Sequence, residues 1–173
     1  EGQPLEDNRL FWQIFKNATT VFRGLEPGDT ASMVLETESP NVPVFSDEIG
    51  ISFEDTLMEG HSLVIDYLID NLKQEKPRGK VVSIVANIFM ENEVETANLY
   101  GQIVSYFNEN YGVSSGLYGD YSWDGITHKS TPMQVHLKMA DNKKGLTINF
   151  VDTEPYREEI EGNPTSIEEN SAS

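Results

Sequence analysis

The amino-acid sequence predicts a single α+β domain in which helices cover one face of an antiparallel sheet. Two stretches, residues 10–22 and 91–111, repeat apolar residues at every third or fourth position, which is typical of amphipathic helices. Other segments alternate apolar and polar residues, as strands with one buried face do. Because helices and strands do not take turns one by one along the chain, a doubly wound parallel sheet is not expected.

The first helix is predicted over residues 10–22, with Asp7 or Asn8 as its capping residue and Gly24 at its end. A second, short helix is expected at residues 30–36, and two prolines that follow it prevent its continuation. The apolar positions of the first helix are Leu10, Phe11, Ile14, Phe15, Ala18, Val21 and Phe22.

The period then changes from helical spacing to strict alternation, which predicts strands at residues 49–54 and 61–70. A turn is expected at residues 73–80 because it contains proline and glycine among charged residues. Residues 81–90 are apolar on both faces, so they predict a long strand in the middle of the sheet.

The most regular helix is predicted to begin at residues 91–93, where acidic side chains suit the helix dipole, and to end at Gly112. Two or three strands follow, the last two at residues 133–139 and 146–150, with a hairpin loop at 141–145 between them. The buried side of the helix is expected to consist of Val94, Ala97, Gly101, Val104, Phe107 and Tyr111.

The expected organisation is one domain over residues 1–152 and a flexible acidic tail over residues 153–173, which holds six glutamates and one arginine. Within the domain, two helix-plus-meander halves, residues 10–90 and 93–152, are one alternative arrangement. No residue-level repeat between them indicates a duplication.

The chain is strongly acidic, with 29 Asp and Glu against 12 Lys and Arg and a net charge of −17. Such a charge repels phosphate backbones and anionic lipid, so we expect neither nucleic-acid nor membrane-surface binding. The absence of cysteine removes disulfides, thiolate metal sites and thiol nucleophiles. Because no apolar stretch of about 18 residues is present, a membrane span is not expected.

The sequence contains neither the nucleotide-binding glycine motifs nor the zinc-protease and nucleophile-elbow motifs. Its histidines, His61, His128 and His136, do not stand at metal-ligand spacing, so surface or capping roles are expected. Residues 120–125 match the first half of an EF-hand loop, but position twelve is Thr131, which cannot provide a bidentate carboxylate. We therefore expect a strand there, and no catalytic residue, metal or cofactor.

The candidate binding residues are Tyr118, Tyr121, Trp123 and His136, which belong to an aromatic segment and to a predicted polar strand face. Tyr121 and Trp123 share parity, so on one strand their side chains point to the same side. If that side is the core, they pack there. If it is solvent, they form a contact patch for a ligand or a protein.

Three features carry a resemblance that covers the C-terminal third to half of the chain. They are the helix 94–112 with its Asn-Tyr-Gly end, the aromatic strand at Trp123, and the closing strands 135–139 and 146–150. With them, the chain resembles small bacterial secreted or cell-envelope α+β domains of unknown function. The resemblance implies an extracytoplasmic location, periplasmic or cell-surface, with the cytoplasm as the alternative. The first residue, Glu1, is not a methionine, so we expect that a preceding segment has been removed.

These observations predict a non-catalytic extracytoplasmic domain that binds a protein or an envelope component, with its oligomeric state left open. A first alternative is an acidic inhibitor or immunity-type protein that neutralises a basic enzyme, because charge would steer such an association. A second alternative is an enzyme with a dispersed site. It would be recognised by a deep pocket that holds one of the histidines beside a carboxylate with a perturbed pKa.

Overall fold

A computed structural model describes residues 8–18, 20–47, 49–69 and 79–153. Its helices are α1 (Arg9–Phe15), α2 (Ala31–Glu38) and α3 (Glu93–Tyr111), with a 3₁₀ turn, η2, at Met58–Gly60. Its strands are β1 (Phe45–Ser46), β2 (Gly50–Thr56), β3 (Ser62–Ile69), β4 (Val81–Phe89), β5 (Ser115–Leu117), β6 (Asp120–Ile126), β7 (Pro132–Met139) and β8 (Gly145–Asp152). The predicted α+β class is confirmed.

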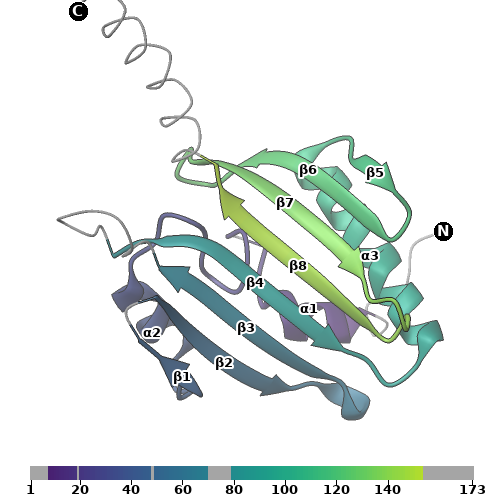
Figure 1. The fold of residues 1–173 in the computed structure, drawn as a ribbon, viewed down its shortest axis with the longest axis horizontal. Helices are drawn as coiled ribbons and strands as arrows, with labels where there is room; N and C mark the ends of the chain where they lie inside the picture. The colour runs from purple at the N-terminus through teal and green to yellow at the C-terminus, as the bar shows by residue number, and fades with distance from the viewer. Residues whose placement is uncertain (1–7, 19, 48, 70–78, 154–173) are drawn as a thin grey trace, which may run out of the picture.

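The eight strands form one antiparallel sheet in the order β1-β2-β3-β4-β8-β7-β6-β5. Two four-stranded meanders therefore meet where β4 pairs with β8, and helical segments precede each meander along the chain. Figure 1 shows the sheet in front, with α1 and α3 behind it. The predicted central place of residues 81–90 is confirmed, and so is the alternative of two helix-plus-meander halves.

The first helix is shorter than predicted, since α1 ends at Phe15 and not near residue 22. Lys16 follows with a φ of 70°, a conformation that stops a right-handed helix. Further along, the chain makes a tight turn in which Arg23 and Gly24 both have positive φ, and Phe22 pairs with Leu25 across it. The chain thus folds back at residues 22–25 instead of continuing a helix, and Val21 and Phe22 are buried, with the Phe22 ring 5.4 Å from that of Phe150 in β8.

The other two helices begin at capping residues. The Thr30 side chain accepts the Met33 amide hydrogen at 3.2 Å, and the Asn92 side chain accepts that of Glu95 at 2.8 Å. The predicted end of α3 at Gly112, whose φ is 92°, is confirmed.

The predicted buried side of α3 is wrong except at Phe107 and the half-buried Val104 and Tyr111. Val94 is 71% exposed, and Ala97 and Gly101 also face solvent. A stripe rotated around the helix carries larger apolar side chains, which bury more surface and so decide the orientation. The buried residues of α3 are Thr96, Leu99, Tyr100, Ile103 and Phe107.

Aromatic rings fill the space between the helices and the C-terminal half of the sheet. The Phe107 ring lies 5.1 Å from that of Trp123, 5.9 Å from that of Phe150 and 5.9 Å from that of Phe15, each close to edge-to-face. Such contacts stabilise beyond the area that they bury. Phe107 is thus the residue through which α3, α1 and the sheet share one core.

A buried ionic group occupies the corresponding place in the N-terminal half. Arg23, 4% exposed, donates to Glu38 at 3.2 Å and to Asp55 at 2.8 Å. It also donates to the carbonyls of Gln13 and Ile14 at the end of α1. We call Arg23, Glu38, Asp55 and Tyr67 the arginine hub, because the Tyr67 hydroxyl donates to Glu38 as well.

The arginine hub joins α1, α2, β2 and β3 through charge-assisted hydrogen bonds. Burial, together with the Glu38 carboxylate, raises the pKa of Tyr67 well above its ordinary value. Tyr67 therefore stays a neutral donor across the physiological pH range.

All of the predicted tail at 153–173 except its first residue, and most of the predicted turn at 73–80, lie outside the described residues. Within the described part of the chain, no helix has the length and apolar character that crossing a membrane requires.

Candidate functional site

In the part of the chain that the structure describes, the helices leave one side of the eight-stranded sheet uncovered, and we call this side the open face (Figure 1). Residues paired across antiparallel strands point to the same side of a sheet. One such row crosses all eight strands through Phe45, Ser52, Asp66, Val85, Asn149, His136, Ser122 and Ser115. The open face is thus a continuous surface shared by both halves.

Polar side chains on the open face are paired across neighbouring strands. Ser83 donates to Asn149 at 2.7 Å, and Thr147 donates to Asn87 at 2.9 Å. Both pairs lie on the central strands β4 and β8. They hold the middle of the face in one arrangement, so a partner would meet a surface that is already ordered.

The open face also carries large apolar side chains in contact with solvent. Leu117 is 81% exposed, Ile126 66%, Phe45 56% and Phe89 54%. Exposed carboxylates accompany them at Glu54, Asp120 and Asp124, and one exposed lysine, Lys138, stands among the described residues of β2–β8 that point to this face. The described part of the open face therefore has exposed apolar side chains and more exposed carboxylates than exposed lysines.

The four residues predicted to bind a partner fall into two groups. The shared side of Tyr121 and Trp123 is the core side, where Trp123 is 1% exposed and donates to Asn108 at 3.0 Å. The packing alternative therefore describes Trp123, and Tyr121 is half-buried beside it. His136 lies on the open face as predicted, and Tyr118 is 67% exposed in the β5–β6 turn, over the ring of Tyr100.

Each histidine lies beside a carboxylate. His136 contacts Asp120 on the open face, and His128 Nδ1 lies 3.2 Å from Glu26. Glu26 is 2% exposed, accepts the amide hydrogen of Lys129 at 3.1 Å, and so clamps the β6–β7 loop to the turn after Leu25. His128 and Tyr111 both line a small cavity of about 180 Å³. Burial raises the pKa of the Tyr111 hydroxyl.

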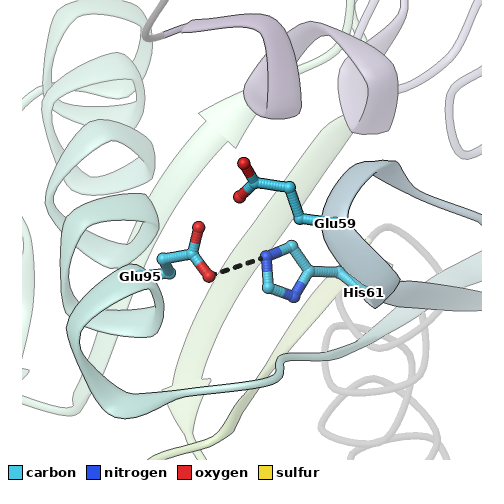
Figure 2. A group of neighbouring side chains, drawn as sticks. All are labelled: Glu59, His61 and Glu95. Atoms are coloured by element: carbon cyan, nitrogen blue, oxygen red, sulfur yellow. Dashed lines mark ion pairs between the residues drawn. The ribbon is translucent and has the colours of Figure 1, made fainter.

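The third histidine belongs to a cluster that brings together distant parts of the chain (Figure 2). Glu59 and His61 come from the connection between β2 and β3, and Glu95 comes from the first turn of α3. One ligand atom from each of the three lies within 4.8 Å of the others. His61 Nε2 and a Glu95 carboxylate oxygen are 3.2 Å apart.

The backbone fixes His61 and Glu59 in this cluster. The amide of Leu57 donates to the His61 carbonyl at 2.8 Å and closes the loop. Glu59 and Gly60 have φ values of 56° and 83°, and a Cβ at Gly60 would lie 2.8 Å from a Glu91 carboxylate oxygen. The positive φ of Gly60 favours glycine at this turn.

The two carboxylates affect each other's protonation. The pKa of Glu59 is raised by its hydrogen bond to Glu95 and by the negative charge there. The pKa of Glu95 is lowered because Glu59 and Asn92 donate hydrogen bonds to it. Glu59 is thus the member that holds a proton more readily.

Sequence reasoning named His61 but missed Glu59 and Glu95 as its neighbours. The spacing Glu59-x-His61 is a weak signal, and two strands, β3 and β4, separate His61 from Glu95 in the sequence. Only the pairing of β3 with β4, which brings the start of β3 to the end of β4 and hence to α3, creates the cluster.

The calcium alternative at residues 120–125 is wrong in its geometry, because β6 runs through the segment as a regular strand paired with β7. Asp120, Ser122 and Asp124 point from it to the open face, and Tyr121 and Trp123 point to the core side. An EF-hand loop would instead fold these oxygen atoms around one point.

Compared with known proteins, the chain matches no protein-family model, no curated protein and no solved structure.

Proposed function

We propose that this protein is a non-catalytic binding protein that contacts a basic protein partner through the open face of its sheet. The observation that carries the proposal is the uncovered side of an eight-stranded sheet, which joins exposed apolar side chains to an excess of carboxylates. Apolar contact area supplies affinity and charge supplies steering and selectivity.

Charge favours a basic partner over a second copy of the chain. Two open faces placed against each other would bring Glu54 and Asp124 of one copy toward carboxylates of the other, which costs free energy. The whole chain carries −17, so association with a basic protein would be fast and salt-sensitive. A basic enzyme neutralised by this protein is one form that such a partnership can take.

Exposed leucine and phenylalanine side chains would complete the contact. Phe89 and Leu117 lie in different meanders, and both point away from the core. A partner that covers both must extend across the strands between β4 and β5. A contact of that width requires a protein and not a small ligand. An extracytoplasmic location for this encounter remains part of the proposal.

The test uses cytochrome c as a basic probe protein and maps its contact on the full chain by amide chemical shifts. We expect shifts on β2–β8 residues of the open face, and weaker binding as salt rises. Glu54→Gln with Asp124→Asn should weaken binding. Glu36→Gln with Glu109→Gln, which makes the same change in charge on exposed helix positions, should not.

Shifts confined to the helices, or equal weakening by both charge pairs, would contradict the proposal because general acidity would then explain binding. Shifts of open-face amides on dilution without cytochrome c would show self-association. In that case the partner of the open face would be a second copy of the chain and not a basic protein.

A further inference from the structure

The cluster of Glu59, His61 and Glu95 lies apart from the open face, and the proposed function gives it no role. Two of its members are carboxylates from separate segments that approach each other within 4.8 Å. The hydrogen bond from Glu59 to Glu95 places a proton between them. When that proton is lost the two carboxylates repel, unless another positive charge takes its place. The position between these carboxylates is therefore one where a cation would be favoured.

His61 gives a second, independent indication. The residue is 1% exposed, and its Nε2 makes no well-aligned hydrogen bond to the residues that the structure describes, although a Glu95 carboxylate oxygen lies 3.2 Å away. A buried ring nitrogen without a partner costs free energy. Figure 2 shows the imidazole edge with Nε2 turned toward the carboxylates of Glu59 and Glu95. An ion placed there would contact all three side chains.

A hydrogen bond on the side away from the carboxylates fixes the orientation of the His61 ring. His61 Nδ1 accepts the amide hydrogen of Glu91 at 3.1 Å, so the other ring nitrogen has to face the cluster. Glu95 is also held, because Asn92 donates to its carboxylate at 2.7 Å. The Asn92 contact orients the Glu95 carboxylate before an ion arrives, as supporting contacts in metal sites do.

We propose that Glu59, His61 and Glu95 form a binding site for a divalent transition-metal ion, with zinc as its best representative. One imidazole nitrogen and two carboxylate oxygens are a donor set that zinc accepts, with water in the remaining position. The geometry supplies the three donors from two segments, the η2 turn with the His61 that follows it and the first turn of α3.

One contact limits how tightly the ion binds. In most metal-bound histidines the second ring nitrogen donates a hydrogen bond, whereas Nδ1 of His61 accepts one. Because Nδ1 accepts this hydrogen bond, the neutral ring carries its proton on Nε2. Zinc can bind Nε2 only when that proton moves to Nδ1, and the Glu91 amide must then turn away. We therefore expect an affinity of the order of micromolar, weaker than that of closed structural zinc sites.

Zinc bound here would link the β2–β3 connection to α3, and so would tie the two halves of the chain together at one end of the sheet. An ion that binds only the folded protein stabilises it by mass action. Zinc binding should therefore raise the thermal unfolding midpoint. This measurement detects binding without an activity assay.

The experiment titrates the full chain with zinc by calorimetry and follows the unfolding midpoint with zinc and with a chelator. We expect one site per chain and a higher midpoint with zinc. Glu59→Gln, at an exposed position where folding should be unaffected, should weaken binding by about tenfold or more. His61→Gln should also weaken it, and Glu93→Gln, in the same helical turn but outside the cluster, should not.

Absence of zinc binding at submillimolar concentration would overturn the site. Binding that Glu59→Gln and His61→Gln leave unchanged would overturn it too, because the ion would then lie on other carboxylates of this acidic chain. If calcium binds as well as zinc and His61→Gln has no effect, the ligands are the carboxylates alone and the three-residue site is wrong.

Discussion

In the N-terminal half, the side chains that hold α1 and α2 to β2 and β3 include a buried arginine and two carboxylates. In the C-terminal half, α3 is held to β6 and β8 mainly by aromatic rings around Phe107. The two halves share a layout but differ in the chemistry beneath their helices. Directional bonds suit short helices with little surface to bury, whereas the 19-residue α3 presents enough apolar area to pack without them.

The largest expected effect is at the arginine hub. Arg23→Met leaves Glu38, which is 5% exposed, without its counter-charge, and should lower the free energy of unfolding by about 3–5 kcal/mol. Urea unfolding measures this. Lys138→Met, which removes an exposed charge, should cost less than about 0.5 kcal/mol. Adding Glu38→Leu to Arg23→Met should recover part of the loss. If it recovers none, the buried charge of Glu38 is not the cause.

A smaller effect is expected in the aromatic core. Phe107→Leu keeps an apolar side chain but removes the ring contacts to Trp123, Phe150 and Phe15, so we expect a loss of about 1–3 kcal/mol. Phe45→Leu, at an exposed position of the open face, is the matched control and should change stability by less than about 0.5 kcal/mol. Equal losses for the two would mean that the rings around Phe107 contribute no more than an exposed ring.

The smallest expected effect comes from removing the capping side chains at the N-termini of α3 and α2, one in each half. Asn92→Ala removes a cap whose amide also donates to Glu95, and should cost about 1 kcal/mol. Thr30→Ala removes a single bond and should cost somewhat less. Circular dichroism during urea unfolding follows both. Asn98→Ala, in the exposed middle of α3, should leave stability unchanged or raise it slightly. A larger loss for Thr30→Ala would contradict the comparison.

Sequence patterns predicted most of the strands and both ends of α3, because period and glycine position are local properties. The end of α1 was mispredicted for the opposite reason. Residues 18–22 keep a helical spacing, yet Arg23 draws the chain back so that its guanidinium reaches α2 and β2. No local rule anticipates a buried arginine, because its partners Glu38 and Asp55 are chosen by tertiary contact.

The candidate sites show the same limit. His61 and His136 could be named from sequence, but their carboxylate neighbours Glu95 and Asp120 could not, since strand pairing brings them together. The facing of Trp123 was likewise undecided until the neighbours of β6 were known. Parity predicted that Tyr121 and Trp123 share a side, and the burial of Trp123 identified that side as the core.

The pairing of β4 with β8 has a consequence for how the molecule is made. The last strand in sequence lies between β4 and β7 in the sheet, so β4 and β7 both remain open edges until β8 has been synthesised. During translation, the N-terminal half would expose a long apolar strand with unpaired backbone groups, a form prone to join other chains. The sheet can therefore be completed only after the last strand of the domain has been synthesised. Shortened chains that lack β8 should be recovered as aggregates.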